Sequence, residues 1–414
     1  MPFHHHTLPN GLNLIGETSP KSKSAAVGFF VRTGSRDEAD AAISGVSHFL
    51  EHMVFKGTPR RSSLDVNREF DAIGANYNAY TSEENTVFYA SVLPEYVPQA
   101  VDILADILRP SLRGEDFDME KKVIIEEIGM YDDQPNWYVY DHAKKAFFAD
   151  HPLGNSVLGS VGSITALTRE QMAGYFDRRY VASNVTVSIA GNFDWDAFVK
   201  LAEKHCGHWS TGEAPRNNVV PAKQNPRIES KKKDGVSQEH VLIISPGPGS
   251  DDPLRYAADT LSMILGDASG SRLYWDLVDP GHAESADVGF HDYQGTGSFF
   301  TSYSCDPEEA EANLARIAKV FDAAQKDGVT AAELHTAKSK VLSRVVRSSE
   351  RPMGRMQAIG MSWIYLGQYR SVDDELAAFE AVDLAQIRQV LDRYPLTQPA
   401  IFTLGPLEKV ANAF

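Results

Sequence analysis

Hydrophobic residues recur along the chain with two different spacings, which predict strands in some segments and helices in others. Short apolar runs, typical of buried strands, occur at residues 184–190 (NVTVSIA), 239–245 (EHVLIIS), 297–305 (GSFFTSYSC) and 400–405 (AIFTLG). Apolar positions repeat near the helical period at residues 116–131, 254–266, 308–326, 330–347 and 352–365. This mixed order predicts an α+β fold, with helices packed on one face of each antiparallel or mixed sheet.

The same pattern suggests an old duplication into two similar lobes. With 414 residues, the chain exceeds the size of one typical core, so at least two domains are expected. A segment rich in Pro, Asn and Lys, with little periodicity, follows the strand at 184–190, and the strand and helix pattern then starts again. We therefore expect a first lobe at residues 1–211, a connection at 212–233 and a second lobe at 234–414.

Composition and charge exclude several classes of protein. Hydrophobic residues make up 43% of the chain and charged residues 23%, as is typical of globular proteins. No run approaches about 18 apolar residues, so no membrane span is expected. The first residues lack the basic and apolar regions of a secretory signal, so we expect a cytoplasmic location. The formal net charge of −16 argues against nucleic acid as a partner, because phosphate binding requires a basic surface.

The segment His48-Phe-Leu-Glu51-His52 carries the first sign of chemistry. Two histidines four residues apart point the same way on a helix, so His48 and His52 can share one metal ion. A catalytic zinc typically has three protein ligands and an open position for water. Glu51 lies close to that position, where a carboxylate can take a proton from the water. Because this pattern also arises by chance, a third ligand from another element is needed.

The amphipathic segment at residues 116–131 offers candidates for that third ligand. Glu120 and Glu127 are seven residues apart, so two helical turns bring both carboxylates to one face, beside the apolar Ile124. Glu126 points about 100° away and is expected in solvent. We predict Glu127 as the third ligand and Glu120 as a residue that orients a ligand; an ordinary surface glutamate is the alternative for Glu127.

These motifs resemble the pitrilysin-type metallopeptidases, also called inverzincins. The resemblance rests on HFLEHMVFKGTP, NAYTSEENT and EKKVIIEEIGMY, and it extends from TLPNGLNL near the N-terminus to GDASGSRLY in the second half. It implies that His48, His52 and Glu127 bind Zn²⁺, that Glu51 is the general base and that Glu120 has a supporting acidic role. It also implies that the second lobe, which lacks the metal motif, helps to enclose the substrate.

The resemblance further gives a role to Asn78 and Ala79. In similar proteins this Asn-Ala pair lies on an edge strand that accepts the substrate as an added β-strand, through main-chain hydrogen bonds. The alternative is an edge strand with no partner, protected by polar residues.

The chain departs from the family pattern in its second half. Catalytic relatives usually have an Arg and, seven residues later, a Tyr shortly after the Ser-Arg-Leu motif, where they hold the substrate and stabilise the oxyanion. Val278 and Ser285 occupy these positions here. His291 or Tyr293 could take over after a loop shift, with no physical reason to prefer either. Oxyanion donors are typically worth roughly 10² to 10³ in rate, so their loss should matter.

Three interpretations remain open, and they differ in what supplies the missing donors. We favour the metal-bearing subunit of an endopeptidase, whose related partner chain supplies Arg and Tyr and which cleaves unfolded peptides in a closed chamber. The second interpretation is a homodimer with replacement donors. The third is a non-catalytic relative that keeps zinc as a structural or peptide-binding protein. The intact Glu51 argues against the third, because a scaffold needs no base beside the metal.

Overall fold

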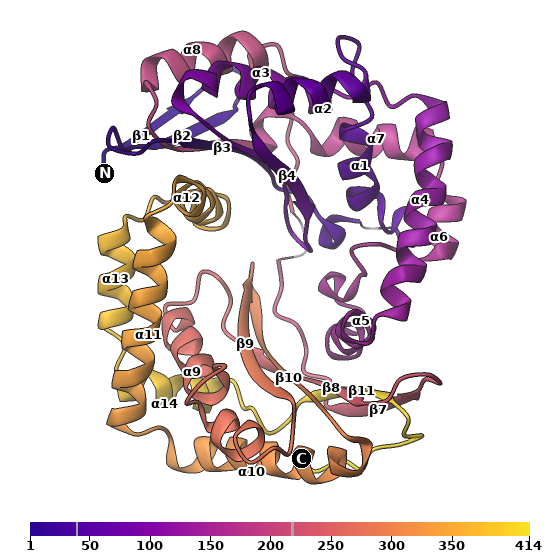
Figure 1. The fold of residues 1–414 in the computed structure, drawn as a ribbon, viewed down its shortest axis with the longest axis vertical. Helices are drawn as coiled ribbons and strands as arrows, with labels where there is room; N and C mark the ends of the chain where they lie inside the picture. Colours follow the sequence, from indigo (N-terminus) through magenta and orange to yellow (C-terminus); the bar gives the residue numbers. More distant parts are fainter. Residues whose placement is uncertain (39, 217–218) are drawn as a thin grey trace. The chain divides into compact units, whose positions relative to one another are not determined.

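The computed structural model describes residues 1–38, 40–216 and 219–414, which form two compact units (Figure 1). The first unit contains Met1–Ile128, Asn155–Asn217 and Val346–Val372; the second contains Gly129–Gly154, Asn218–Val345 and Asp373–Phe414. The units differ from the expected continuous lobes, because residues 129–154 belong with the second unit and residues 346–372 with the first. Within the expected connection at 212–233, residues 217 and 218 lie outside the described part of the chain.

The first unit is built on a six-stranded sheet in which β4 is an edge strand. The order is β1 (Phe3–Thr7), β2 (Asn13–Thr18), β6 (Val185–Gly191), β3 (Ala25–Val31), β5 (Thr86–Val92) and β4 (Asn76–Thr81). Strands β2 and β6 are parallel, and the other neighbours are antiparallel. Every residue of β3 is buried, as expected for a strand whose sequence, AAVGFFV, is apolar on both faces.

Helices cover both faces of this sheet. On one face, the main core includes residues of α1 (Val46–Val54), α2 (Ser63–Ala72), α3 (Val97–Ile107), α4 (Gly114–Asp133), α7 (Arg169–Arg179) and α8 (Trp195–Cys206). On the other face, Met356 and Ile364 of α12 (Pro352–Leu366) pack against Phe30 and Val87. The short helix α6 (Val161–Ala166) precedes α7. The packing of α12 explains why residues 346–372 join the first unit.

The second unit has a five-stranded sheet with the same mixed character. Its order is β7 (Arg227–Lys232), β11 (Ala400–Gly405), β8 (Glu239–Gly247), β10 (Thr296–Cys305) and β9 (Ser285–Tyr293). Strands β7 and β11 are parallel, and the other neighbours are antiparallel.

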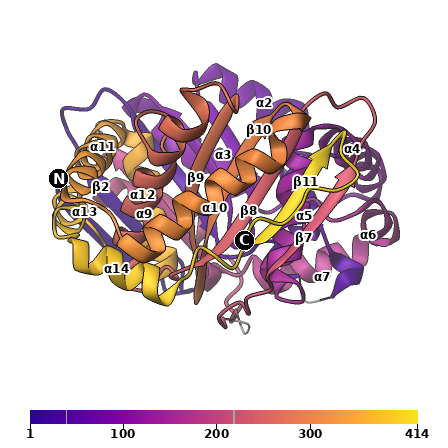
Figure 2. The ribbon, with the colours of Figure 1, turned by 90° about the horizontal axis from the view of Figure 1, so that it is seen from below.

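Helices again lie on both faces of the second sheet. One face packs on α9 (Arg255–Gly266), α10 (Ala310–Asp327) and α14 (Leu384–Arg393), and Figure 2 shows α10 crossing the strands. On the other face, α5 (Pro135–Phe148) places Val139 and Phe147 against Leu242, Ile244 and Phe402. Two further helices are α11 (Ala331–Ser349) and α13 (Val372–Glu380). The α+β class with mixed sheets and packed helices is thus confirmed, with α12 and α5 as additional helices on the second face of their sheets.

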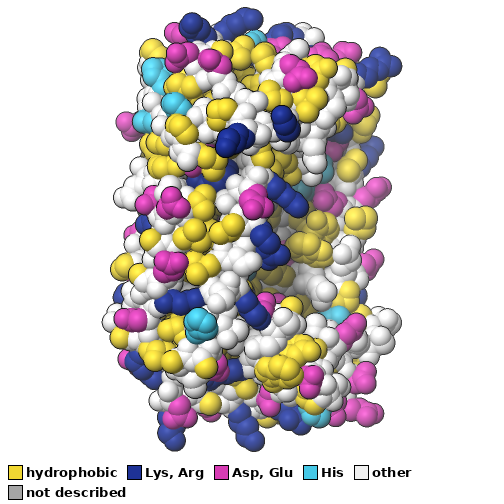
Figure 3. All heavy atoms as spheres, turned by 60° about the vertical axis from the view of Figure 1, so that its left-hand side comes forward, with side chains coloured by type: hydrophobic (Ala, Val, Ile, Leu, Met, Phe, Trp, Pro, Cys, Tyr) yellow, Lys and Arg dark blue, Asp and Glu magenta, His cyan; other side chains and the backbone are white. Residues whose placement is uncertain are grey.

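Side chains of both charge signs are exposed, and the described residues contain no membrane-spanning helix. Lys and Arg side chains are interspersed with Asp and Glu on the face shown in Figure 3, together with hydrophobic residues. Among the described residues, no helix combines the length and the apolar character that crossing a bilayer requires.

Candidate metal centre

Helix α1 carries the His-x-x-Glu-His segment, and its start is fixed by a buried carboxylate. Glu38 accepts hydrogen bonds from the backbone N–H groups of Gly45, at 2.7 Å, and Ser47, at 2.9 Å. These groups lie at the helix N-terminus, where no intrahelical acceptor exists. Burial raises the pKa of Glu38 to about 8, although both N–H groups act in the opposite direction. The apolar residues of α1, including Phe49, Leu50 and Met53, are buried in the core, which directs the two histidines to a common face.

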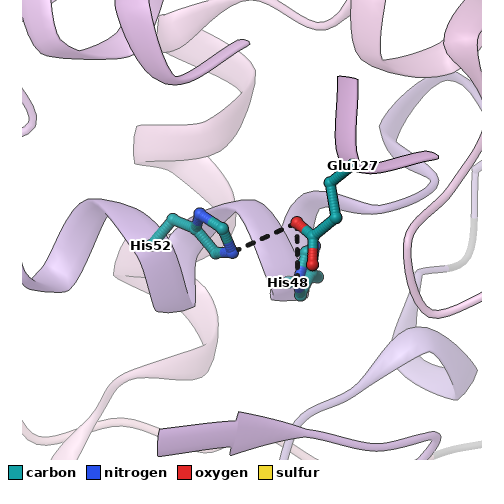
Figure 4. A group of neighbouring side chains, drawn as sticks. All are labelled: His48, His52 and Glu127. Carbon is teal, nitrogen blue, oxygen red and sulfur yellow. Dashed lines mark ion pairs between the residues drawn. The ribbon is translucent and has the colours of Figure 1, made fainter. Parts of the chain in front are cut away.

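His48, His52 and Glu127 come together as a possible ligand set (Figure 4). The Oε2 atom of Glu127 lies 3.7 Å from Nε2 of His48 and 3.5 Å from Nε2 of His52. The three ligand atoms all lie within 4.8 Å of one another. A tetrahedral zinc with bonds of about 2.0–2.1 Å separates its ligand atoms by roughly 3.4 Å, so the arrangement suits such an ion.

The electrostatics of the three residues also fit a cation. Burial lowers the pKa of His48 to about 3, so its imidazole is neutral and has a lone pair to share. Burial raises the pKa of Glu127, and the charge of His52 only partly opposes that shift. Its Oε2 atom is buried and accepts no hydrogen bond from any described residue, although it faces both imidazoles. A divalent ion would satisfy this oxygen.

Glu120 lies behind His52 and not among the three ligand atoms. Its Oε1 is 2.8 Å from Nδ1 of His52, and its Oε2 is 2.5 Å from the ammonium of Lys56. Burial alone would raise the pKa of Glu120, but the contacts with His52 and Lys56 outweigh it and lower that pKa. For His52, burial acts to lower the pKa, and the bond to Glu120 and the charge of Glu127 raise it overall. The ionised Glu120 thus holds the Nδ1–H of His52 and leaves Nε2 directed at Glu127.

Glu51 is anchored from the sheet by a hydroxyl group. Thr81, the last residue of β4, donates a hydrogen bond from Oγ1 to Oε2 of Glu51 at 2.6 Å. Burial raises the pKa of Glu51, and the Thr81 bond partly opposes that shift. Neither Thr81 nor Lys56 was predicted from the sequence. The four-residue spacing between His52 and Lys56 could have indicated that Lys56 lies near the site. No sequence pattern connects Thr81 to Glu51.

Asn78 and Ala79 lie in β4, at the edge of the first sheet. They pair with Tyr89 and Phe88 of β5, and no strand of the described chain lies on the other side of β4. The side-chain Oδ1 of Asn78 accepts a hydrogen bond from the backbone N–H of Ala79 at 2.8 Å. An added strand that uses this N–H would have to displace the Asn78 side chain.

The positions of the missing Arg and Tyr lie in the second unit. Val278 ends a π-helical turn at Tyr274–Val278 and packs against the core, and Ser285 begins β9 with its hydroxyl 3.3 Å from that of Ser304. Tyr293 is buried with its ring against Phe148. His291 is exposed on β9. Of the two suggested replacements, His291 is therefore the more accessible.

Comparison with known proteins identifies the family. Residues 14–161 match the family described as "Insulinase (Peptidase family M16)", and residues 166–341 match "Peptidase M16 inactive domain". The chain therefore belongs to peptidase family M16, and the predicted family and its zinc cofactor are confirmed at that level. The "inactive domain" description agrees with a second half that lacks the metal motif.

Similar proteins extend over nearly the whole chain. An uncharacterized zinc protease of Mycobacterium tuberculosis is 34% identical over 406 residues, which cover 97% of this chain and 92% of that protein. An uncharacterized zinc protease of Bacillus subtilis is 31% identical over 384 residues, covering 92% and 93%.

Solved structures share the fold. A protease from Helicobacter pylori superposes with a TM-score of 0.92 at 22% identity, over 98% of this chain and 99% of that chain. A peptidase M16 inactive domain from Pseudomonas fluorescens gives a TM-score of 0.91 at 18% identity, over the full length of both chains. At these identities, the likeness concerns the fold alone.

Proposed function

We propose that this protein is a zinc-dependent endopeptidase that cleaves unfolded peptides. The observation that carries the proposal is the convergence of the Glu127 carboxylate with the imidazoles of His48 and His52, with Glu51 on the same helix as both histidines. Two neutral imidazoles and one carboxylate form a typical catalytic zinc ligand set, and they leave one position open. The zinc proteases among the relatives support this choice of ion.

The residues of this chain divide the work of peptide hydrolysis. When bound, Zn²⁺ supplies Lewis acidity, which polarises a carbonyl group and lowers the pKa of water. Glu51 takes the proton from the attacking water and later gives it to the leaving amine, so no covalent intermediate with the protein forms. Thr81 holds Glu51 in position, and Glu120 holds His52. The free edge of β4, at Asn78 and Ala79, aligns the peptide as an added strand.

The absent Arg and Tyr support a two-chain enzyme. Val278 and Ser285 offer neither a cation nor a phenol, so a donor for the developing oxyanion must come from elsewhere. We propose that a related partner chain supplies it, with the substrate held in a closed chamber. The alternative enzyme is a homodimer in which an accessible side chain such as His291 replaces the missing pair. A non-catalytic protein that binds zinc and peptides is the remaining possibility.

One set of assays separates these possibilities. The purified chain, loaded with zinc, is incubated with unfolded fluorogenic peptides, alone and together with a related chain that carries the Arg and Tyr. Activity only in the mixture supports the two-chain enzyme, and activity of the chain alone supports the homodimer. Glu51→Gln should abolish cleavage and retain zinc. Equal cleavage by the wild type and Glu51→Gln would refute the proposed base, and no cleavage under any condition would favour the non-catalytic protein.

A further inference from the structure

The turn that joins β4 to β5 begins directly after Thr81, the residue that anchors Glu51. In this β4–β5 turn (residues 82–85), the backbone N–H of Ser82 donates to the carbonyl oxygen of Asn85 at 2.8 Å. The backbone N–H of Asn85 donates in return to the hydroxyl oxygen of Ser82 at 3.1 Å. Because the turn is closed by its own hydrogen bonds, the position of the Thr81 hydroxyl depends on what holds the turn as a whole.

The segment after β3 holds one side of the β4–β5 turn. The backbone N–H groups of Ser35 and Arg36 donate to the carbonyl oxygens of Ser82, at 3.3 Å, and Glu83, at 2.8 Å. Gly34 lies so close to the turn that a Cβ atom there would collide with both of these oxygens. The turn is therefore packed directly against this segment.

Arg216 holds the other side of the turn. Its Nη2 donates to the backbone carbonyl oxygen of Glu84 at 2.5 Å, and its Nη1 lies 3.3 Å from the carboxylate of the same residue. Asp37 orients the guanidinium by accepting from Nε at 3.0 Å and from Nη2 at 2.7 Å. The three side chains are at most 3% exposed, so solvent screens these ion pairs little. The planar fork of Arg suits such a double contact, which Lys cannot reproduce.

Arg216 lies in the segment that was expected to connect the two lobes. The preceding residues are also bonded into the first unit, since Nη1 of Arg179 donates to the carbonyl oxygens of Ala214 and Pro215 at 3.1 and 3.2 Å. Burying a charged side chain carries a desolvation cost of several kcal/mol per ion, which a simple tether would have no reason to bear. The start of the connection is therefore part of the structure around the turn.

We propose that Arg216 is a positioning residue for the proposed peptidase reaction. Through Glu84 and Asp37 it fixes the β4–β5 turn, and the fixed turn keeps the hydroxyl of Thr81 on Glu51. The inference rests on the proposed function, because its effect on the rate requires Glu51 to act as the base. It adds that the connection between the expected lobes takes part in forming the site.

Two variants disturb the turn from its two sides. Arg216→Lys keeps one positive charge and loses the fork that binds the turn. Gly34→Ala changes no charged group and presses a methyl group on the turn; the extended backbone of Gly34, with φ of −165°, accepts alanine. Both variants should lower kcat about three- to tenfold, with KM within about twofold of the wild type and zinc content unchanged. The upper limit is the loss of about tenfold that we expect for Thr81→Val, because the effect passes through Thr81.

A double-mutant cycle with Thr81→Val tests the route of the effect. In a chain that already carries Thr81→Val, Arg216→Lys should lower kcat by less than about twofold, since the Thr81 bond is already lost. Arg61→Lys is the matched control, because Arg61 is also a buried Arg of the first unit, and it pairs with carboxylates on α2 and α3. It should retain the wild-type kcat even where it lowers the Tm. All rates are measured under the conditions in which the wild type cleaves unfolded fluorogenic peptides.

Hydrogen–deuterium exchange provides a measurement that does not depend on activity. Peptides that cover the β4–β5 turn should exchange faster in Arg216→Lys and Gly34→Ala than in the wild type and Arg61→Lys. Thermal unfolding verifies that each variant is folded, and Gly34→Ala decides the matter if Arg216→Lys is not.

Two kinetic outcomes would overturn the inference and leave the proposed function intact. One is a wild-type kcat in folded Arg216→Lys and Gly34→Ala; the other is the same loss of kcat with and without Thr81→Val. A wild type that cleaves no peptide would instead count against the proposed function. In that case, unchanged exchange of the turn in both variants would overturn the inference that Arg216 holds it.

Discussion

The contact between Glu120 and His52 gives the sharpest prediction about zinc affinity. Glu120→Gln keeps an oxygen that can accept the Nδ1–H of His52 but removes the negative charge. It also removes the ion pair with Lys56, whose side chain is 32% exposed and so remains partly hydrated. We therefore expect His52 to keep its position, but with a lower basicity and a less firmly fixed ring orientation.

The expected loss follows from this geometry. A partner of a ligating histidine is worth roughly 10- to 100-fold in metal affinity, which corresponds to about 1.4–2.7 kcal/mol. We expect the lower half of this range, because the amide oxygen can still accept the hydrogen bond. The cost in folding stability should be about 1 kcal/mol or less, since solvent reaches the ammonium of Lys56.

The assay is competition for zinc between the protein and a chromophoric chelator at pH 7.5. Glu126→Gln provides the control, because Glu126 is exposed on the same helix and undergoes the same chemical change. Glu120→Gln should lose affinity, and Glu126→Gln should retain that of the wild type. Equal affinities of all three proteins would refute the argument that Glu120 controls His52.

Two further predictions concern the base and the start of α1. Thr81→Val should lower kcat about tenfold with zinc content unchanged, because Glu51 loses the hydroxyl that holds it. Thr81→Ser keeps a hydroxyl and should retain most of the rate. An equal loss of kcat in both variants would contradict a role for the hydroxyl. The pKa of Glu38 is raised from 4.5 to about 8, so its protonated form stabilises the native state, fully so below pH 4.5. As the pH rises from 4.5 to 8 this stabilisation is lost, and the free energy of unfolding falls by up to about 1.4 kcal/mol per pH unit. Glu38→Gln should flatten that slope in urea unfolding across pH 5 to 8; an unchanged slope would show that Glu38 titrates normally.

Local spacing accounts for the part of the site that could be predicted from the sequence. His48 and His52 share a face because four residues make about one helical turn, and Glu120 and Glu127 share a face because seven make about two. The structure brings His48, His52 and Glu127 together and places Glu120 behind His52. These relations depend on helix geometry, which periodicity reveals.

Other features depend on tertiary packing and were not visible in the sequence. The Thr81 bond to Glu51 joins the end of β4 to α1, and no local pattern encodes the approach of two such elements. Likewise, the periodicity at residues 352–365 predicts a helix but not the sheet that it covers. Helix α12 packs on the first sheet because Phe30 and Val87 leave an apolar second face there. Tertiary packing of this kind places residues 346–372 in the first unit, through α12, and residues 129–154 in the second unit, through α5.

The proposed function depends on a zinc ion held by two imidazoles and one carboxylate. Metal analysis by mass spectrometry, after zinc loading and gel filtration, tests it directly on the wild type, Glu127→Ala and Glu126→Gln. We expect one zinc ion per chain in the wild type and in Glu126→Gln, and a loss of most of that zinc in folded Glu127→Ala. Full zinc content and unchanged zinc affinity in Glu127→Ala would show that Glu127 is not a ligand.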